Sequence, residues 1–370
     1  MRVPFLDLAA QYAPIRSEVE SAINAVLDTG AFALGPTVDQ FEAEFAEYVG
    51  AKHCVGLNSG TSALHLALLA AGVGPGDEVI TTPHTWISTS WGISYAGATP
   101  VYVDVDRATG NLNPSNVEAA ITSRTKVILP VDIYGSPADH AAFEEIARRH
   151  DLRLIDDAAQ AHGASLNGRP IGSFGFATCW SFYPGKNLGA AGEGGAVVTD
   201  DPEVAARIRS LRDHAQVGRH NHVEVGFNAR MDGLQGAVLS VKLKYLDDWN
   251  DSRRKAAARY EQLFANVDGV VIPSSIPGAE PSWHLFVIRV QERDALAEAF
   301  ADAGIGSGVH YPTPVHLQPA YAHLGYRPGS FPVAEAFAAK CISLPMFPEI
   351  TPEQQQHVAD VTVHWMERVA

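Results

Sequence analysis

The chain has 370 residues, with 27 lysines and arginines against 42 aspartates and glutamates, so its formal net charge is −15 at pH 7. This charge repels nucleic acid and anionic membrane surfaces, and we expect neither as a general partner. The length suits two domains, which we place at residues 1–248, a large domain with an N-terminal helical segment, and 249–370, a small C-terminal domain.

The three cysteines and the first residues indicate the compartment. Cys54, Cys179 and Cys341 are an odd set in apolar runs, which favours buried free thiols over disulfides or a metal site. The first twenty residues contain charges and prolines before any apolar stretch could act as a signal peptide or membrane span. We expect a soluble, cytoplasmic protein.

The first predicted elements are two helices, one from the apolar spacing of residues 15–26 and one through residues 41–49. Short β-like runs then alternate with helical patterns, and several are apolar throughout, as strands covered on both faces must be. This order predicts a layered α/β domain. The runs lie at residues 54–57, 78–82, 100–105, 126–131, 153–157, 179–183 and 195–199.

The alternation of strand-like runs with helical patterns ends in the last third of the chain. Residues 233–264 have the pattern of long helical structure, and they are followed by a strand at 283–290 and a helix at 292–303. Residues 311–332 are rich in Pro, Tyr and His, and we expect them to form an ordered surface loop that could line a cleft.

Two segments near strand ends could meet a cofactor. Residues 58–62 (NSGTS) lie between a strand and a helix, where amides and hydroxyls suit a phosphate, although such a turn is also common as a plain helix cap. Trp86 follows another strand end, where it could stack on a cofactor ring or simply belong to the core.

Lys186 lies in SFYPGKNLGAAGEGG, a stretch whose only other charge is Glu193. Desolvation of this kind lowers the pKa of an amine and favours Schiff-base chemistry. Asp156 and Asp157 end the strand at 153–157, and one of them could hold a protonated pyridine nitrogen, the alternative being helix capping. A lysine and a carboxylate held together are what pyridoxal phosphate requires, so the sequence predicts an enzyme with this cofactor.

Six motifs occur in order over nearly the whole chain: NSGTSAL, TWIST, DDAAQAHGA, SFYPGKNLGAAGEGG, GFNARMDGLQGAVL and HYPTPVHLQPAY. Together they resemble the DegT/StrS-type sugar aminotransferases. The resemblance implies fold type I of the pyridoxal phosphate enzymes, with a mainly parallel seven-stranded sheet in the large domain and a smaller C-terminal α/β domain. It also implies a homodimer whose active sites lie at the subunit interface.

The resemblance also implies roles for individual residues. Lys186 would bind the cofactor covalently and then move the proton, Asp157 would pair with the pyridinium nitrogen, and Gln160 would approach the ring hydroxyl. Trp86 would cover the ring. The phosphate would be held by Gly60, Thr61 and Ser181, and by Asn228 from the neighbouring subunit.

Candidate substrate residues come from the segment around the lysine and from two later loops. They are Tyr183, Arg219, His310, Tyr311 and His316. The segment 207–230 holds five arginines, which read either as a solvated helix face or as a grip for a nucleotide diphosphate. Its histidines lack further ligands at suitable spacing, so we expect no metal site.

The predicted function is conversion of a keto sugar nucleotide to an amino sugar, with L-glutamate as the amino donor implied by the resemblance. Tyr183 and Pro184 before GKNLGA favour the branch acting on 3-keto sugars, of the 6-deoxyhexose type, over the 4-keto branch. Two rivals remain. A dehydratase on the same fold is disfavoured because its relatives replace the lysine with histidine, and a non-catalytic regulator is disfavoured because every expected chemical group is present.

Overall fold

The computed structural model describes residues 1–218 and 220–369. Its centre is a seven-stranded sheet in the order β1-β9-β8-β5-β4-β2-β3. The pairs β3/β2, β2/β4, β4/β5 and β5/β8 are parallel, and β9 is antiparallel to both of its neighbours. The mainly parallel seven-stranded sheet is therefore confirmed.

Each of the seven predicted β-like runs overlaps one strand of this sheet. The strands are β1 (His53–Leu57), β2 (Glu78–Thr81), β3 (Thr99–Tyr102), β4 (Thr125–Ile128), β5 (Arg153–Asp157), β8 (Ala177–Ser181) and β9 (Gly195–Thr199).

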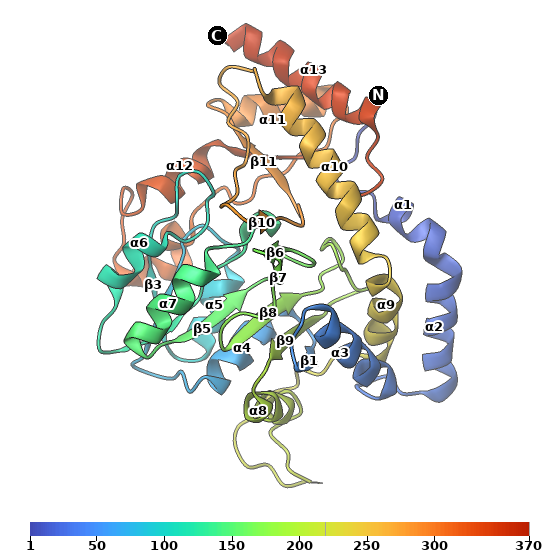
Figure 1. Ribbon diagram of the computed structural model, residues 1–370, viewed down its shortest axis with the longest axis vertical. Coiled ribbons are helices and arrows are strands. Elements are labelled where there is room, and N and C mark those ends of the chain that lie inside the picture. Colours follow the sequence, from blue (N-terminus) through green and yellow to red (C-terminus); the bar gives the residue numbers. More distant parts are fainter. Residues whose placement is uncertain (219, 370) are drawn as a thin grey trace.

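Helices cover both faces of the sheet (Figure 1). One face packs against α4 (Gly60–Ala70), α5 (Ser88–Tyr95) and α8 (Pro202–Arg212), and the other against α3 (Pro36–Tyr48), α7 (His140–His150) and α9 (Gly233–Leu243). In β9, Val197 packs toward α4 and α8, whereas Ala196 and Val198 pack toward α3 and α9. Burial on both faces explains why these strands are continuously apolar.

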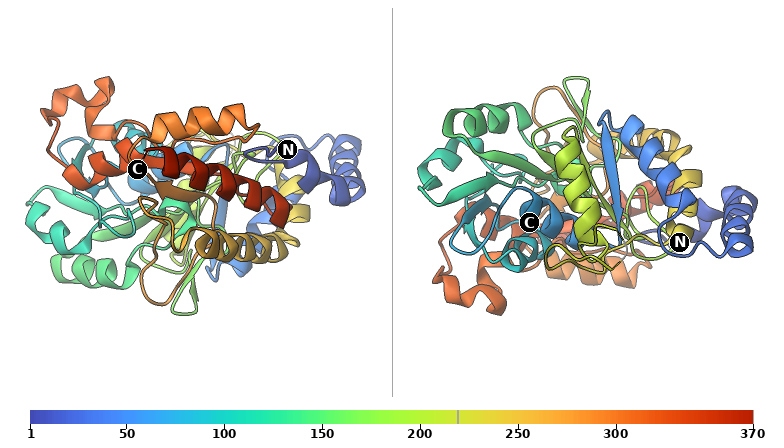
Figure 2. Two further views of the ribbon diagram at one scale, coloured as in Figure 1. Left: turned by 90° about the horizontal axis from the view of Figure 1, so that it is seen from above. Right: turned by 90° about the horizontal axis from the view of Figure 1, so that it is seen from below.

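The remaining elements flank this layered body. The helices α1 (Leu8–Tyr12) and α2 (Arg16–Thr29) extend along one side, where α2 packs on α9 (Figure 2). Shorter elements are α6 (Pro114–Val117) and a small sheet of β10 (Ala279–Glu280), β6 (Ser165–Leu166) and β7 (Arg169–Pro170). The 3₁₀ helices are η1 (Ala13–Ile15), η2 (Glu118–Ala120), η3 (Ile133–Gly135), η4 (Val315–Leu317) and η5 (Pro319–Leu324).

The C-terminal part has its own core. An antiparallel pair, β11 (Phe286–Arg289) and β12 (Cys341–Leu344), packs with α10 (Leu246–Phe264), α11 (Arg293–Asp302) and α13 (Pro352–Val369), and α12 (Pro332–Lys340) leads into β12. The predicted strand and helix at 283–303 are confirmed. The strand β12 was not predicted, since its four residues carry no alternation that would distinguish them from a helix end.

The predicted long helical segment is two helices, α9 and α10, separated at Lys244 and Tyr245. The division proposed near residue 248 falls in the first turn of α10, so this helix joins the two parts. Val3, at the other end of the chain, is buried in the C-terminal core. Division of the chain into two domains at this point stays our proposal. Among the described residues, no helix combines the length and apolar character needed to cross a membrane.

Candidate active site

A cavity of about 750 Å³ opens at the carboxyl ends of the parallel strands. This edge is where ligands bind in parallel α/β sheets. Its walls come from segments far apart in the chain: the start of α4, the loop after β2, the end of β5, the loop after β8 and the C-terminal part. Ten predicted residues line it: Gly60, Thr61, Trp86, Asp157, Gln160, Ser181, Tyr183, Lys186, His310 and Tyr311.

One end of the pocket is the N-terminus of α4. Ser59 caps this helix by accepting a hydrogen bond from the Ser62 amide at 3.1 Å, and Thr61 Oγ1 donates to Ser88 Oγ at 2.9 Å. A Cβ atom at Gly60 would lie 2.7 Å from the Cβ of Ser181, so β8 can approach the turn this closely only at a glycine. The amides and hydroxyls of this turn suit a phosphate.

Asp157 lies at the carboxyl end of β5 and is 5% exposed. Its carboxylate accepts hydrogen bonds from Thr89 Oγ1 at 2.7 Å and from the Ala159 amide at 3.3 Å. Burial raises the pKa of Asp157, while these two hydrogen bonds and Lys186 act in the opposite direction. The carboxylate is therefore held in one orientation in a pocket that also contains the lysine.

Lys186 lies in the turn after β8, where its amide donates to the Tyr183 carbonyl at 2.8 Å. Burial lowers the pKa of its amine to about 8, and Asp157 offsets part of this effect. Lys242 also has its pKa lowered to about 8 by burial, but its Nζ donates to the Gly189 carbonyl at 2.5 Å and it does not line the pocket. Geometry, rather than pKa, distinguishes the two lysines.

The loop that carries Lys186 is fixed by the residue that follows it. Asn187 is fully buried, and its Nδ2 donates to Asn250 Oδ1 at 2.9 Å and to the Ser282 carbonyl at 2.8 Å. Its Oδ1 lies 3.2 Å from His284 Nδ1. These contacts join the lysine loop to α10 and to the segment before β11, which orients the lysine from both parts of the chain.

Three predicted residues form a connected wall of the pocket. Gln160 accepts a hydrogen bond from the Tyr134 amide at 2.6 Å and donates from Nε2 to the Tyr311 hydroxyl at 3.0 Å. The Tyr311 ring lies 5.5 Å from the ring of Trp86. Trp86 is 55% exposed toward the pocket, as expected of an aromatic surface that a flat ligand would cover.

Two predicted residues lie outside this pocket, and a third lies outside the described residues. His316 is buried against Phe331, with its Nε2 3.2 Å from Glu335. Because its ring packs in this core and does not line the pocket, the prediction that His316 contacts the substrate is corrected. Asn228 is exposed, and its backbone pairs with Asp213. Arg219 is not among the described residues.

The arginines of segment 207–230 are largely paired with acids. Arg212 is buried in an ion pair with Glu42, and Arg209 donates to the Cys54 carbonyl at 2.9 Å. Arg230 and Arg207 approach Asp213 and Glu224 at 3.1 and 3.5 Å. The interpretation that these arginines together bind a nucleotide diphosphate is therefore wrong for Arg212, because its charge is buried and paired with Glu42.

Sequence reasoning missed several lining residues, among them Phe5, Leu6, His284 and Met346. None lies in a motif with polar or glycine-rich character, and three are plain apolar residues. Only the packing of the first residues, of the segment before β11 and of the segment after β12 around the lysine loop brings them to the site.

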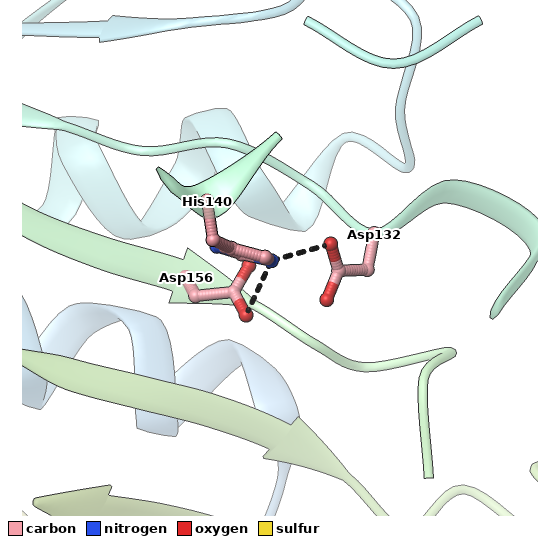
Figure 3. A group of neighbouring side chains, drawn as sticks. All are labelled: Asp132, His140 and Asp156. Atoms are coloured by element: carbon pink, nitrogen blue, oxygen red, sulfur yellow. Dashed lines mark hydrogen bonds and ion pairs between the residues drawn. The ribbon is translucent and has the colours of Figure 1, made fainter. Parts of the chain in front are cut away.

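Asp156 points away from the pocket, because successive side chains of a strand alternate between faces. It meets Asp132 and His140 in the buried cluster of Figure 3. His140 Nε2 lies 2.9 Å from Asp132 Oδ1 and 3.6 Å from Asp156 Oδ2. The Asp132 amide also donates to the Asp157 carbonyl at 3.1 Å, so this cluster supports the strand end that carries Asp157.

Comparison with known proteins identifies the class. Residues 14–362 match the model of the DegT/DnrJ/EryC1/StrS aminotransferase family, and the chain belongs to this family. It is a pyridoxal phosphate-dependent aminotransferase of fold type I.

Several relatives cover almost the whole chain. It is 51% identical to the erythromycin biosynthesis sensory transduction protein EryC1 of Saccharopolyspora erythraea, over 97% of this chain and 98% of that protein. It is 48% identical to the dTDP-3-amino-3,4,6-trideoxy-α-D-glucose transaminase of Streptomyces venezuelae, over 100% and 97%. It is 44% identical to the UDP-N-acetyl-3-dehydro-α-D-glucosamine 3-aminotransferase of Acidithiobacillus ferrooxidans, over 97% and 96%.

The crystal structure of S. venezuelae DesV in complex with a ketimine intermediate superposes with a TM-score of 0.98 at 48% identity, and each chain is covered completely.

The residues present fit pyridoxal phosphate. The glycine at position 60 leaves the α4 amides and the Ser181 hydroxyl accessible to a phosphate, and Asp157 supplies a buried carboxylate for a protonated ring nitrogen. The amine of Lys186 lines the same cavity. These groups come from the α4 turn, the ends of β5 and β8, and the turn after β8.

We predict that borohydride reduction fixes the cofactor to Lys186 and not to Lys242, since only Lys186 lines the pocket. Peptide mapping by mass spectrometry of the reduced protein identifies the modified lysine. Lys186→Ala should remain folded by circular dichroism, yet lose both the reduced adduct and the absorbance of the bound cofactor. An adduct on the Lys242 peptide, or one that persists in Lys186→Ala, would contradict the assignment.

The cluster of Figure 3 predicts a pH-dependent stability. Burial alone would lower the pKa of His140, but Asp132 and Asp156 more than offset this and raise it to about 9. The resulting stabilisation is complete below pH 6.5 and is lost as the pH rises through 9, with an upper limit of about 3 kcal/mol.

The free energy of unfolding in urea, measured from pH 6 to pH 9.5, tests this expectation. His140→Gln should flatten the decline, whereas His150→Gln, at the exposed end of the same helix, should not. Equal slopes in the wild type and in His140→Gln would show that His140 does not carry its charge in the folded protein.

Proposed function

We propose that this aminotransferase acts on a nucleotide-linked keto sugar and converts its keto group to an amine, with L-glutamate as the amino donor. The observation that carries the proposal is the placement of Lys186, Asp157 and the α4 turn in one cavity. The names of the S. venezuelae and A. ferrooxidans relatives supply the substrate class. We also propose a cytoplasmic location, as for a biosynthetic enzyme.

Each pocket residue has a chemical task in this proposal. When bound, pyridoxal phosphate stores the electron pair released as the substrate carbon loses its proton. Lys186, whose pKa of about 8 lies near neutrality, takes up and returns that proton as a general base and acid. Asp157 holds the ring nitrogen in its protonated form, and Trp86 and Gln160 orient the ring.

The pocket of one subunit has few cations for its anionic substrates. Among the described residues that line it, Lys186 is the basic side chain, and it is committed to the cofactor. The glutamate carboxylates and the sugar diphosphate therefore need basic groups from elsewhere. We propose that a neighbouring subunit supplies them, as part of a homodimer with shared active sites.

The segment after α8 is the part that would reach a neighbour. It projects beyond the body of the subunit, below α8 in Figure 1. Bridges between Asp213 and Asn228 and between Gln216 and His222 give it a hairpin-like course. Val217, Val223 and Val225 are 57%, 58% and 85% exposed on it, and apolar side chains this exposed favour an interface. Asn228 belongs to this segment.

Carbon 3 is the proposed position of the keto group. The names of the S. venezuelae and A. ferrooxidans relatives both place the nitrogen there. Tyr183, which suggested this branch, is 55% exposed and lines the pocket beside Gly185. It is thus placed to contact a sugar at the lysine. A 4-keto substrate is the second candidate, and the presence of Lys186 disfavours both the dehydratase and a regulator without turnover.

Incubation of the cofactor-loaded enzyme and L-glutamate with matched 3-keto and 4-keto sugar nucleotides tests the substrate class. We expect a product in which an amine replaces the ketone, detected by mass spectrometry, with at least tenfold higher kcat/KM for the 3-keto isomer. Turnover of the 4-keto isomer alone would show that the enzyme places the amine at carbon 4. Turnover of neither isomer would reject the sugar nucleotide proposal.

The shared site predicts complementation between two inactive variants. Lys186→Ala removes the reactive lysine of its own site. Asn228→Asp introduces a negative charge at the residue that we propose contacts the cofactor phosphate of the neighbouring subunit. A mixed dimer then has one intact site, so mixing after subunit exchange should restore up to about a quarter of wild-type activity, by random assortment of a C2 dimer. Absence of recovery, with exchange confirmed by native mass spectrometry, would place Asn228 and Lys186 in sites that are not shared.

A further inference from the structure

We propose that Phe5, Leu6 and Met346 form an apolar wall that selects a sugar whose exocyclic carbon, C6, is a methyl group. The inference rests on the proposed function and assigns the substrate feature that this part of the pocket recognises. All three residues line the same cavity as Lys186, and nothing in the six sequence motifs points to them.

The wall is fixed in place by the C-terminal part of the chain. The Val3 amide donates to the Gly304 carbonyl at 2.9 Å, and the Gly306 amide donates to the Val3 carbonyl at 2.8 Å. A Cβ atom at Gly306 would lie 2.5 Å from the Phe5 nitrogen, so the two segments are in direct backbone contact. Backbone contacts with the C-terminal part therefore hold residues 3–6 in place at the pocket.

Its apolar side chains reach the immediate surroundings of the reactive lysine. Leu6 Cδ2 lies 3.5 Å from the position that a Cβ atom would take at Gly185, the residue before Lys186. The Phe5 ring stacks on His310 at a centroid distance of 5.8 Å and an interplanar angle of 14°. A hexose that reacts at Lys186 through carbon 3 therefore has the rest of its ring, including the carbon that carries C6, within reach of this wall.

Other lining groups of the same region are polar but uncharged. His310 Nδ1 lies 2.8 Å from Ser343 Oγ, and burial and Lys186 lower the pKa of His310 to about 4. Burial, with Lys186 and other neighbours, also lowers the pKa of His284. Neutral imidazoles can exchange hydrogen bonds with the ring hydroxyls of a sugar, whereas the three wall side chains offer no such partner. This division orients the sugar.

The chemistry of the sugar identifies the substituent that the wall takes. C6 is the one carbon of a hexopyranose that projects from the ring, so it is the group that can fill an apolar recess. A methyl group there is buried favourably, while a hydroxymethyl group loses its bonds to water without replacement. An apolar pocket discriminates against an added hydroxyl by up to about a hundredfold, and a buried carboxylate is worse. The carboxylates of the amino donor must accordingly bind away from this wall.

Discrimination by the wild-type enzyme is the direct test. Three 3-amino sugar nucleotides that share one nucleotide and differ only at C6, as methyl, hydroxymethyl or carboxylate, are assayed in reverse with 2-oxoglutarate. We expect kcat/KM to fall at least tenfold from methyl to hydroxymethyl, and further for the carboxylate. Equal values would overturn this proposal and leave the proposed function intact. Turnover of none of them, with the 3-keto sugars also inert in the forward assay, would overturn both.

A matched pair of variants locates the discrimination. Leu6→Gln should lower the methyl-to-hydroxymethyl ratio at least fivefold, because its amide can bond the hydroxyl. Leu8→Gln, an exposed position two residues later that does not line the pocket, should leave the ratio unchanged. If Leu6→Gln does not retain the cofactor, Leu6→Thr provides the same comparison with a shorter polar side chain. A ratio that stays at the wild-type value in a folded Leu6 variant would overturn the assignment of the wall.

Discussion

Burial opposes the charged forms of both Lys186 and Asp157, and each residue offsets part of that cost for the other. This pair is the constraint on which the rest of the site depends. An amine with a pKa near neutrality can carry a proton and release it, and a desolvated carboxylate acts strongly on a nearby cation. Neither property survives full exposure to water, so the surrounding structure has to exclude water and hold both groups in place.

Much of the polar chemistry outside the cavity serves this purpose. Asn187 joins the lysine loop to α10, and Lys242 holds the Gly189 carbonyl at the end of that loop. Arg253, which is 1% exposed, donates to the Met346 carbonyl at 3.0 Å and to those of Trp283 and His284 at 3.2 and 3.3 Å. These charges and amides are buried because they satisfy backbone carbonyls of irregular segments, which have no ladder partners.

The negative charge of the protein is compatible with anionic substrates because the charges are unevenly placed. The lining of the pocket has few carboxylates, with Asp157 buried and Glu193 at its exposed edge. Positive charge on the segment after α8 is partly used in the fold, as the pair between Arg230 and Asp213 illustrates. The segment after α8 projects beyond the body of the subunit (Figure 1).

The sequence by itself determined the strands of the sheet, the small polar turn at Gly60 and Lys186 as the candidate reactive lysine, and the family resemblance pointed to Asp157 as its partner. These follow from local patterns. Apolar runs, glycines at close approaches and an isolated lysine favour the same local structure and chemistry whichever distant segments pack against them. Tertiary structure alone decided that Asp157 rather than Asp156 faces the pocket, that His316 packs in a core, that Arg212 neutralises Glu42, and that Phe5 and Leu6 border the lysine. Each of these depends on which distant segment lies against the residue, and contacts between distant segments leave no mark on the local sequence.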